Sequence, residues 1–292
     1  MLWHKAAFIG LPGTGKTTMA LSYPSVQQHC FGSSEETTAK NFVGRTDILP
    51  PLKLDWYETL KPEEKAKFTN EAITELEIAQ LTKLGRARNV ARYRRTLYGL
   101  KDALLNQTTE IQSVVLDNAT PFAQEFEDYV EVVWGKDFLT KDGNFDTIAY
   151  YKRFGAEFTD FLRLFMSLPC HTLVTCHIGM IAPEEVAANT AFLQAAKMGG
   201  VRKDWQPLLT GKAARNAIAS VPDWTFFLKT EETPGQPTAY VAKLEADESN
   251  VGLAKPRIQP YKNPRQIRYT KNKFHEEFAL ALETYLKTGV QV

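Results

Sequence analysis

The sequence has few cysteines and no long apolar run, and each shortage excludes a class of protein. Three cysteines, Cys30, Cys170 and Cys176, are too few and too scattered for a disulfide framework or a zinc site. No apolar stretch approaches the roughly 18 residues that a membrane-spanning helix needs. The first residues, MLWHKAAFIG, do not resemble a signal peptide, because the apolar stretch runs directly into a glycine-rich motif. We therefore expect a cytoplasmic protein without a membrane segment.

The chain also lacks an excess of charge of either sign. Lysine and arginine total 35, and aspartate and glutamate total 34. Only the distribution of charge along the chain can therefore indicate a partner. Hydrophobic residues make up 43% and charged residues 24%, which excludes wholesale disorder. A chain of 292 residues suits two domains or one elaborated α/β domain.

Apolar runs alternate with stretches of helical periodicity over most of the chain. Strands are predicted at 4–9, 26–31, 111–117 and 171–177, and helices at 16–22, 121–134, 146–168, 211–220 and 273–287. Residues 62–106 predict one long helix, or two helices broken near Gly85. Two later strands, 224–230 and 238–244, are typical of a hairpin. This alternation favours an α/β fold in which helices flank a mostly parallel central sheet with an antiparallel hairpin at its edge.

One motif dominates the functional interpretation. Residues 10–17, GLPGTGKT, match the phosphate-binding pattern G-x-x-x-x-G-K-[ST] without a mismatch, between a predicted strand and a predicted helix. In this pattern the backbone N–H groups converge on phosphates, the lysine reaches the β- and γ-phosphates, and the hydroxyl binds Mg²⁺. The motif therefore predicts ATP and Mg²⁺ as ligands, with Lys16 in a catalytic role and Thr17 on the metal. The predicted nucleotide-binding residues are Gly10, Pro12, Gly13, Thr14, Gly15, Lys16, Thr17 and Thr18.

Polar residues close the other predicted core strands. Asp117 ends IQSVVLD, the position from which a phosphate-loop protein holds Mg²⁺ opposite the loop hydroxyl, so we expect it to be the second metal ligand. Either Glu35 or Glu36 could be the general base that polarises the attacking water, or both could complement a helix N-terminus. His177 could sense the γ-phosphate, or it could be a satisfied histidine at a strand end.

Together these motifs resemble those of the RecA-like phosphate-loop ATPases of bacteriophages, a group that includes nucleotide-binding proteins and single-strand annealing recombinases. The resemblance is carried by GLPGTGKTT, VVLDN, TLVTCHIG and LTGKAARNAIASVPDW, and it covers residues 3–244. It implies a RecA-like P-loop fold, with Glu35 or Glu36 as hydrolytic base and His177 as γ-phosphate sensor. It also implies that Lys212 and Arg215 act on the nucleotide of a neighbouring subunit.

The resemblance has further implications for partners and location. The loops at 136–144 and 179–207 would face DNA, the working protein would be a ring or filament, and it would act in the cytoplasm of a phage-infected host cell. The helical segment at about 50–106 has no counterpart in the family pattern. We therefore place a P-loop ATPase core at 1–249 with a helical insertion at about 50–106, and a basic arm with a C-terminal helix at 250–292.

Two stretches concentrate positive charge without any acid. Residues 81–101 and 255–273 each contain seven lysines and arginines together with two tyrosines. Cations bind a phosphate backbone, and aromatic rings stack on unpaired bases, so single-stranded DNA is the expected partner. Without DNA, the first stretch would be a solvated helix face and the second a linker. The candidate DNA-binding residues of the second stretch are Arg257, Lys262, Arg265, Arg268, Tyr261 and Tyr269.

These expectations combine into one leading function and two alternatives. The leading function is an ATP-hydrolysing protein that acts with DNA in phage recombination or replication, by binding or annealing single strands. The first alternative is an ATP-switched assembly or loader protein with slow turnover. The second is a small-molecule kinase, in which arginines at 86–95 would form a lid cluster.

Overall fold

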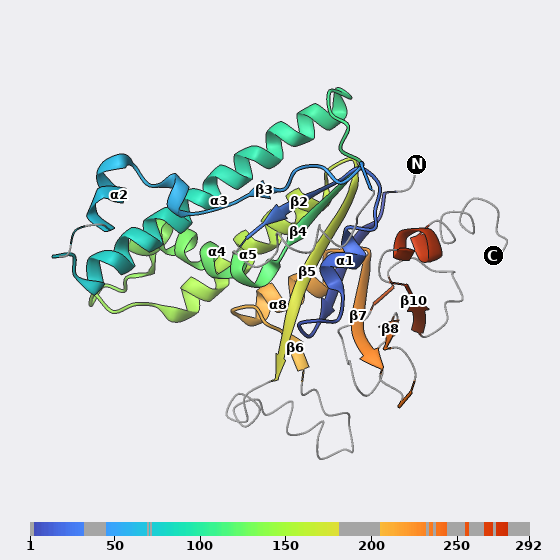
Figure 1. Ribbon diagram of the computed structural model, residues 1–292. Helices are drawn as coiled ribbons and strands as arrows, with labels where there is room; N and C mark the ends of the chain where they lie inside the picture. The colour runs from blue at the N-terminus through green and yellow to red at the C-terminus, as the bar shows by residue number, and fades with distance from the viewer. Residues whose placement is uncertain are drawn as a thin grey trace, which may run out of the picture.

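A mainly parallel β-sheet flanked by helices forms the centre of the structure (Figure 1). The computed structural model describes residues 3–31, 45–68, 70, 72–180, 205–231, 234–235, 238–243, 255–256, 266–270 and 273–279. Among these residues, five parallel strands make up the middle of the sheet: β1 (Lys5–Gly10), β2 (Val26–Cys30), β4 (Ser113–Asp117), β5 (His171–Met180) and β7 (Trp224–Glu231). They lie in the order β7-β1-β5-β4-β2, which confirms the predicted mostly parallel sheet.

Shorter strands extend the sheet. β3 (Leu52–Lys53) pairs in parallel with β2, and β6 (Trp205–Pro207) pairs antiparallel with β5. β8 (Ala239–Lys243) forms the predicted antiparallel hairpin with β7, and β10 (Gln266–Tyr269) continues the sheet beyond it. β9 (Lys255–Pro256) also pairs with β7. The described parts of 250–292, expected as an arm and a helix, thus include two strands of the core sheet, while η5 (His275–Ala279) is the described part of the expected helix.

Helices bury both faces of the sheet. One face packs against α3 (Glu75–Leu105), α4 (Ala119–Trp134), α5 (Thr147–Met166) and α8 (Lys212–Ser220), and the other packs against α1 (Lys16–Ala20) and Phe274. A short helix, η3 (Gly135–Phe138), follows α4. Side chains of β1 alternate between the faces, because Ala7 and Ile9 lie in the first core and Ala6 and Phe8 in the second. Burial on both faces explains why the core strands are continuous apolar runs in the sequence.

The segment at about 50–106 is a structural layer of the fold. After β3 it forms η2 (Tyr57–Thr59) and α2 (Pro62–Phe68), and then α3, which starts with a capping box between Thr74 and Glu77. Neither predicted alternative is right in detail: α2 ends at Phe68 and α3 begins at Glu75, so 62–106 is not one helix, and α3 is unbroken at Gly85. The side chain of Trp56 packs so closely on Gly85 that a Cβ there would lie 2.6 Å from the indole Cε3.

Candidate functional site

Three of the predicted site positions lie together at the carboxyl edge of the sheet. Gly10 ends β1 and is the register partner of His177 on β5. Asp117 ends β4, which pairs with β5 on its other side. Gly10 also approaches β7 closely, since a Cβ on it would lie 2.6 Å from the carbonyl oxygen of Leu228. Ligands of open α/β sheets bind outside this edge, so the fold places these residues where a ligand is expected.

The loop at residues 10–17 is a tight turn stabilised by its own atoms. Gly13 and Gly15 have φ angles of 81° and 83°, in the left-handed region that glycine adopts without a steric penalty. The Thr14 hydroxyl donates a 2.8 Å hydrogen bond to the Leu11 carbonyl. Gly15 is the N-cap of α1 and offers no side chain to its first N–H groups. The sequence forms this turn because glycine occupies both positions that need a positive φ.

Lys16 is a buried cation that is bonded to the loop itself. Its side chain is 5% exposed, and Nζ donates to the carbonyl oxygens of Gly10 at 3.0 Å and Leu11 at 2.7 Å. Burial lowers the pKa of Lys16 to about 8, although the negative charge of Asp117 acts in the opposite direction. A buried cation with so little compensating charge favours a bound anion at this position.

Asp117 is fully buried among hydroxyl and amide donors. Its Oδ2 accepts a 2.8 Å hydrogen bond from Gln28 Nε2, and its Oδ1 accepts one from the Thr175 hydroxyl. The Thr17 hydroxyl also lowers the pKa of this carboxyl group, so the two predicted metal ligands are neighbours. Burial raises the pKa of Asp117, against the effects of these donors and of Lys16. Gln28 and Thr175 were not predicted, and their only sequence signal is a polar residue inside a buried strand.

The two predicted ligands are consistent with magnesium. Mg²⁺ binds few protein oxygens and keeps several waters or phosphate oxygens, so one hydroxyl and one carboxylate suffice for it. Within the described chain, no group of three or more His, Cys, Asp or Glu side chains is arranged to hold a metal ion. A site for a metal that needs a larger set of protein ligands is therefore not present in the described residues.

His177 is hydrogen-bonded to Asn118, the residue that follows Asp117. Asn118 is the N-cap of α4: its Oδ1 accepts from the backbone N–H of Thr120 at 2.8 Å, and its Nδ2 lies 3.1 Å from His177 Nε2. Burial and the nearby charge of Lys16 lower the pKa of His177 to about 4, so the imidazole is neutral at pH 7. Its Nδ1 is inaccessible to solvent and has no hydrogen-bond partner among the described residues.

Several predicted residues lie outside the described part of the chain. They include both candidate bases, Glu35 and Glu36, and four of the candidate DNA contacts, Arg257, Lys262, Arg265 and Tyr261.

The structure contradicts one predicted DNA contact and qualifies another. Tyr269 is 6% exposed and packs edge-to-face on Phe274, with a centroid distance of 5.3 Å, so it is a core residue and cannot stack on a base. Arg268 is exposed but forms an ion pair with Glu231 at 3.1 Å. The tyrosine is buried because β10 docks on the sheet instead of remaining an extended arm.

The basic stretch at 81–101 lies on α3, and its cations are largely paired within the fold. Four of its seven lysines and arginines form ion pairs with acids of α2, α4 and α5: Lys83 with Glu131, Arg86 with Asp128, Arg88 with Glu64, and Arg94 with Glu157. Arg95 remains exposed on the outer side of the helix. This stretch is therefore mainly a set of contacts between helices, and less of it is available to a phosphate backbone than its sequence indicates.

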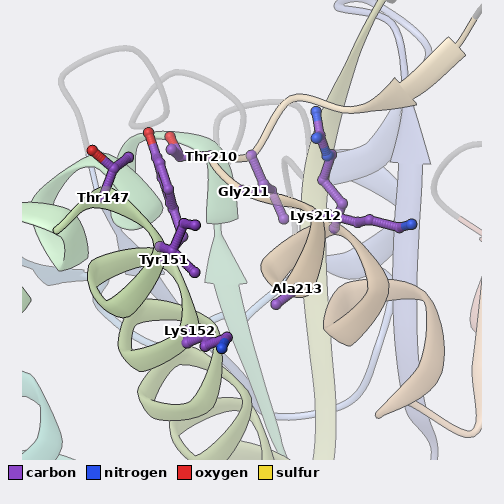
Figure 2. A pocket seen from close by; sticks show the side chains of 10 residues that line it. Thr147, Tyr151, Lys152, Thr210, Gly211, Lys212 and Ala213 are labelled. Carbon is purple, nitrogen blue, oxygen red and sulfur yellow. The ribbon is translucent and has the colours of Figure 1, made fainter. Parts of the chain in front are cut away.

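Lys212 and Arg215 lie at a pocket between the first turns of α5 and α8. Figure 2 shows Tyr151 and Lys152 on α5 across from the residues that begin α8. The pocket has a volume of about 670 Å³, and its described lining contains three cations and no acid. It thus combines an aromatic wall with positive charge, which suits an anionic group.

Comparisons with models of known protein families and with curated proteins each find no match. Among the described residues, no helix combines the length and the apolar character that crossing a membrane requires.

Proposed function

We propose that the chain is a RecA-like phosphate-loop ATPase that binds Mg-ATP at residues 10–17. The observation that supports this most is Lys16, a buried cation whose ammonium group is bonded to carbonyls of the loop. The polyphosphate of a nucleotide is the ligand that would give this cation its missing negative charge. The loop sequence, the edge of the sheet and the proximity of Thr17 to Asp117 support the same ligand.

Each residue of the site has a role in this proposal. Lys16 binds the β- and γ-phosphates, while Thr17 and Asp117 hold the Mg²⁺ that neutralises their charge. Gln28 and Thr175 orient the Asp117 carboxylate through their hydrogen bonds. The base that orients the attacking water is Glu35 or Glu36, as the family resemblance implies.

We further propose that single-stranded DNA is the partner in phage recombination or replication, in the host cytoplasm. The cations of 257–265 and the positively charged pocket at Lys212 and Arg215 support a polyanionic partner or a neighbouring subunit's nucleotide in a ring or filament. The proposed DNA binding can be tested independently of ATP binding, and either can fail without the other.

The variant Lys16→Ala tests the nucleotide site, and the chain offers a matched control. Lys5 begins β1, the strand that leads into the loop; it also donates to two backbone carbonyls, and burial also lowers its pKa to about 8. We expect Lys16→Ala to weaken Mg-ATP binding by about 10–100-fold, the effect of losing charge-assisted hydrogen bonds. Lys5→Ala should lower the melting temperature but leave ATP affinity unchanged. Calorimetric titration with Mg-ATP measures both.

Equal ATP affinity in the Lys16→Ala variant and the parent chain would contradict the assignment. Turnover then identifies the base: Glu35→Gln or Glu36→Gln should slow hydrolysis by about tenfold or more while ATP still binds, because glutamine keeps the size and loses the basicity.

A further inference from the structure

The orientation of the Asn118 amide follows from its partners. The backbone N–H of Thr120 can only donate, so the atom that faces it at 2.8 Å must be the carbonyl oxygen Oδ1. The amide nitrogen Nδ2 then faces His177 Nε2 at 3.1 Å. An amide NH₂ group has only donors, so the hydrogen bond runs from Asn118 to the histidine.

This bond fixes the tautomer of the imidazole. Because Nε2 of His177 accepts, the neutral ring carries its proton on Nδ1. That N–H group is inaccessible to solvent and unpaired among the described residues. Leaving a buried donor unpaired costs about 1–3 kcal/mol, so such a group is usually completed by a ligand or by water.

His177, which carries this donor, lies beside the proposed nucleotide site. His177 is the register partner of Gly10, the first residue of the phosphate-binding pattern. The charge of Lys16 also acts on the imidazole, which places the two side chains in one electrostatic environment. Thr120 keeps this arrangement in place, because its hydroxyl accepts a hydrogen bond from the backbone N–H of His177 at 3.3 Å.

We propose that Asn118 is a positioning residue: it holds His177 as the Nδ1–H tautomer, so that the neutral ring donates a hydrogen bond to the terminal phosphate of ATP. The ligand in this inference rests on the proposed function, whereas the tautomer does not. A neutral donor that meets only the terminal phosphate would give the site a way to distinguish ATP from ADP.

The imidazole nitrogens can be observed directly by NMR. In the full chain labelled with ¹⁵N-histidine, at pH 8, we expect His177 to show a protonated Nδ1 and an unprotonated Nε2. Its signals are those that disappear in His177→Asn. Asn118→Asp keeps the helix cap, since aspartate caps as well as asparagine. Its carboxylate only accepts hydrogen bonds, so the proton should move to Nε2.

Turnover provides the functional measurement. Asn118→Asp should slow ATP hydrolysis by about tenfold, the value of one hydrogen bond, with its Mg²⁺ requirement retained. Two histidine variants form a matched pair. His177→Asn places an amide near the position of Nδ1 and should keep most of the activity, whereas His177→Gln places its amide near Nε2 and should lose about as much as Asn118→Asp. A role that is merely structural would not separate this pair.

Two results would overturn the inference: a parent spectrum with the proton on Nε2, or an Nδ1–H signal that responds equally to Mg-ATP and Mg-ADP. If calorimetry detects no Mg-ATP binding to the parent chain, the proposed function fails, and the contact with the phosphate fails with it. The ligand-free spectra of the parent and Asn118→Asp still decide whether Asn118 sets the tautomer.

Discussion

Among single residues, Glu125 shows how strongly burial governs the chemistry of this fold. It lies on α4, is 6% exposed, and accepts a 2.7 Å hydrogen bond from Asn89 of α3. The same Asn89 amide donates to the Leu54 carbonyl, and Arg92 donates to its Oδ1. Burial raises the pKa of Glu125 to about 7, so the protonated acid is the form that fits this position at mildly acidic pH.

This shift predicts a pH-dependent stability. The pKa of Glu125 rises from its ordinary value of 4.5 to about 7 in the fold, so the folded chain binds more protons between these values. The stabilising contribution of the shifted Glu125 pKa to the free energy of unfolding is fully present below pH 4.5 and is lost as the pH rises through 7. We expect Glu125→Gln to be the more stable chain at pH 8, by up to about 3 kcal/mol, and to lose this advantage towards pH 5. Urea unfolding at both pH values measures the difference.

Glu110→Gln removes an exposed carboxylate and is the control for charge alone. A stability difference between Glu125→Gln and the parent that is constant from pH 5 to pH 8 would show that Glu125 is not a desolvated acid in solution.

Candidate site residues that belong to a local sequence motif could be predicted. Residues that reach the site only through contacts with residues far away in the sequence could not. Residues 10–17 were predicted from eight consecutive letters, and Asp117 from the end of an apolar strand. Gln28 and Thr175 could not be predicted, because they are 89 and 58 positions from Asp117. Only the strand order, with β4 between β2 and β5, brings them to its carboxylate.

Among the helices, α3 contains two glycines, Gly85 and Gly99, that differ in their tertiary surroundings. Gly85 lies against Trp56, where a Cβ would be 2.6 Å from the indole, whereas a Cβ on Gly99 would have nothing within 4 Å. Both are inside the same helix, so their intrinsic helix propensity is the same. Only the tertiary contact distinguishes them.

We therefore expect opposite effects from the same substitution. Gly99→Ala should raise the free energy of unfolding by about 0.5–1 kcal/mol, because alanine loses less backbone entropy than glycine. Gly85→Ala should lower it by about 1–3 kcal/mol, because the indole must move to admit a methyl group. Chemical denaturation of both variants measures this. Equal stabilisation by both would show that the Trp56 ring does not pack on the helix.

The elements themselves were easier to predict than their contacts. Helical periodicity predicted α4 and α5 to within a few residues at each end. β5 continues to Met180, three residues beyond the expected His177, because it gains β6 as a partner from beyond residue 204. The charge pattern of α3 did not reveal its ion pairs, because the paired acids lie on other helices, outside the basic stretch.

For the whole molecule, the distribution of charge limits which residues could form the proposed contact with DNA. Most of the cations of α3 already pair with acids of the fold, and Tyr269 is part of the core. The cations at 257–265 are therefore the best remaining candidates among those predicted in the second basic stretch, with exposed Arg268 beside them.

This assignment predicts how DNA affinity depends on salt. If Arg257, Lys262 and Arg265 each contact a phosphate of a single strand, replacing all three with alanine should flatten the slope of log affinity against log salt by about 2, at about 0.7 per contact. The matched control replaces Arg86, Arg88 and Arg94, which removes the same charge from ion-paired positions; it should lower stability and change the slope much less. Tyr269→Ala should likewise lower the melting temperature, because it removes a buried ring.

Fluorescence anisotropy with labelled single-stranded DNA at several salt concentrations measures the slopes. A slope that flattens only in the control would move the DNA contact to α3, and parental slopes and affinities in both triple variants would exclude the six replaced cations as phosphate contacts.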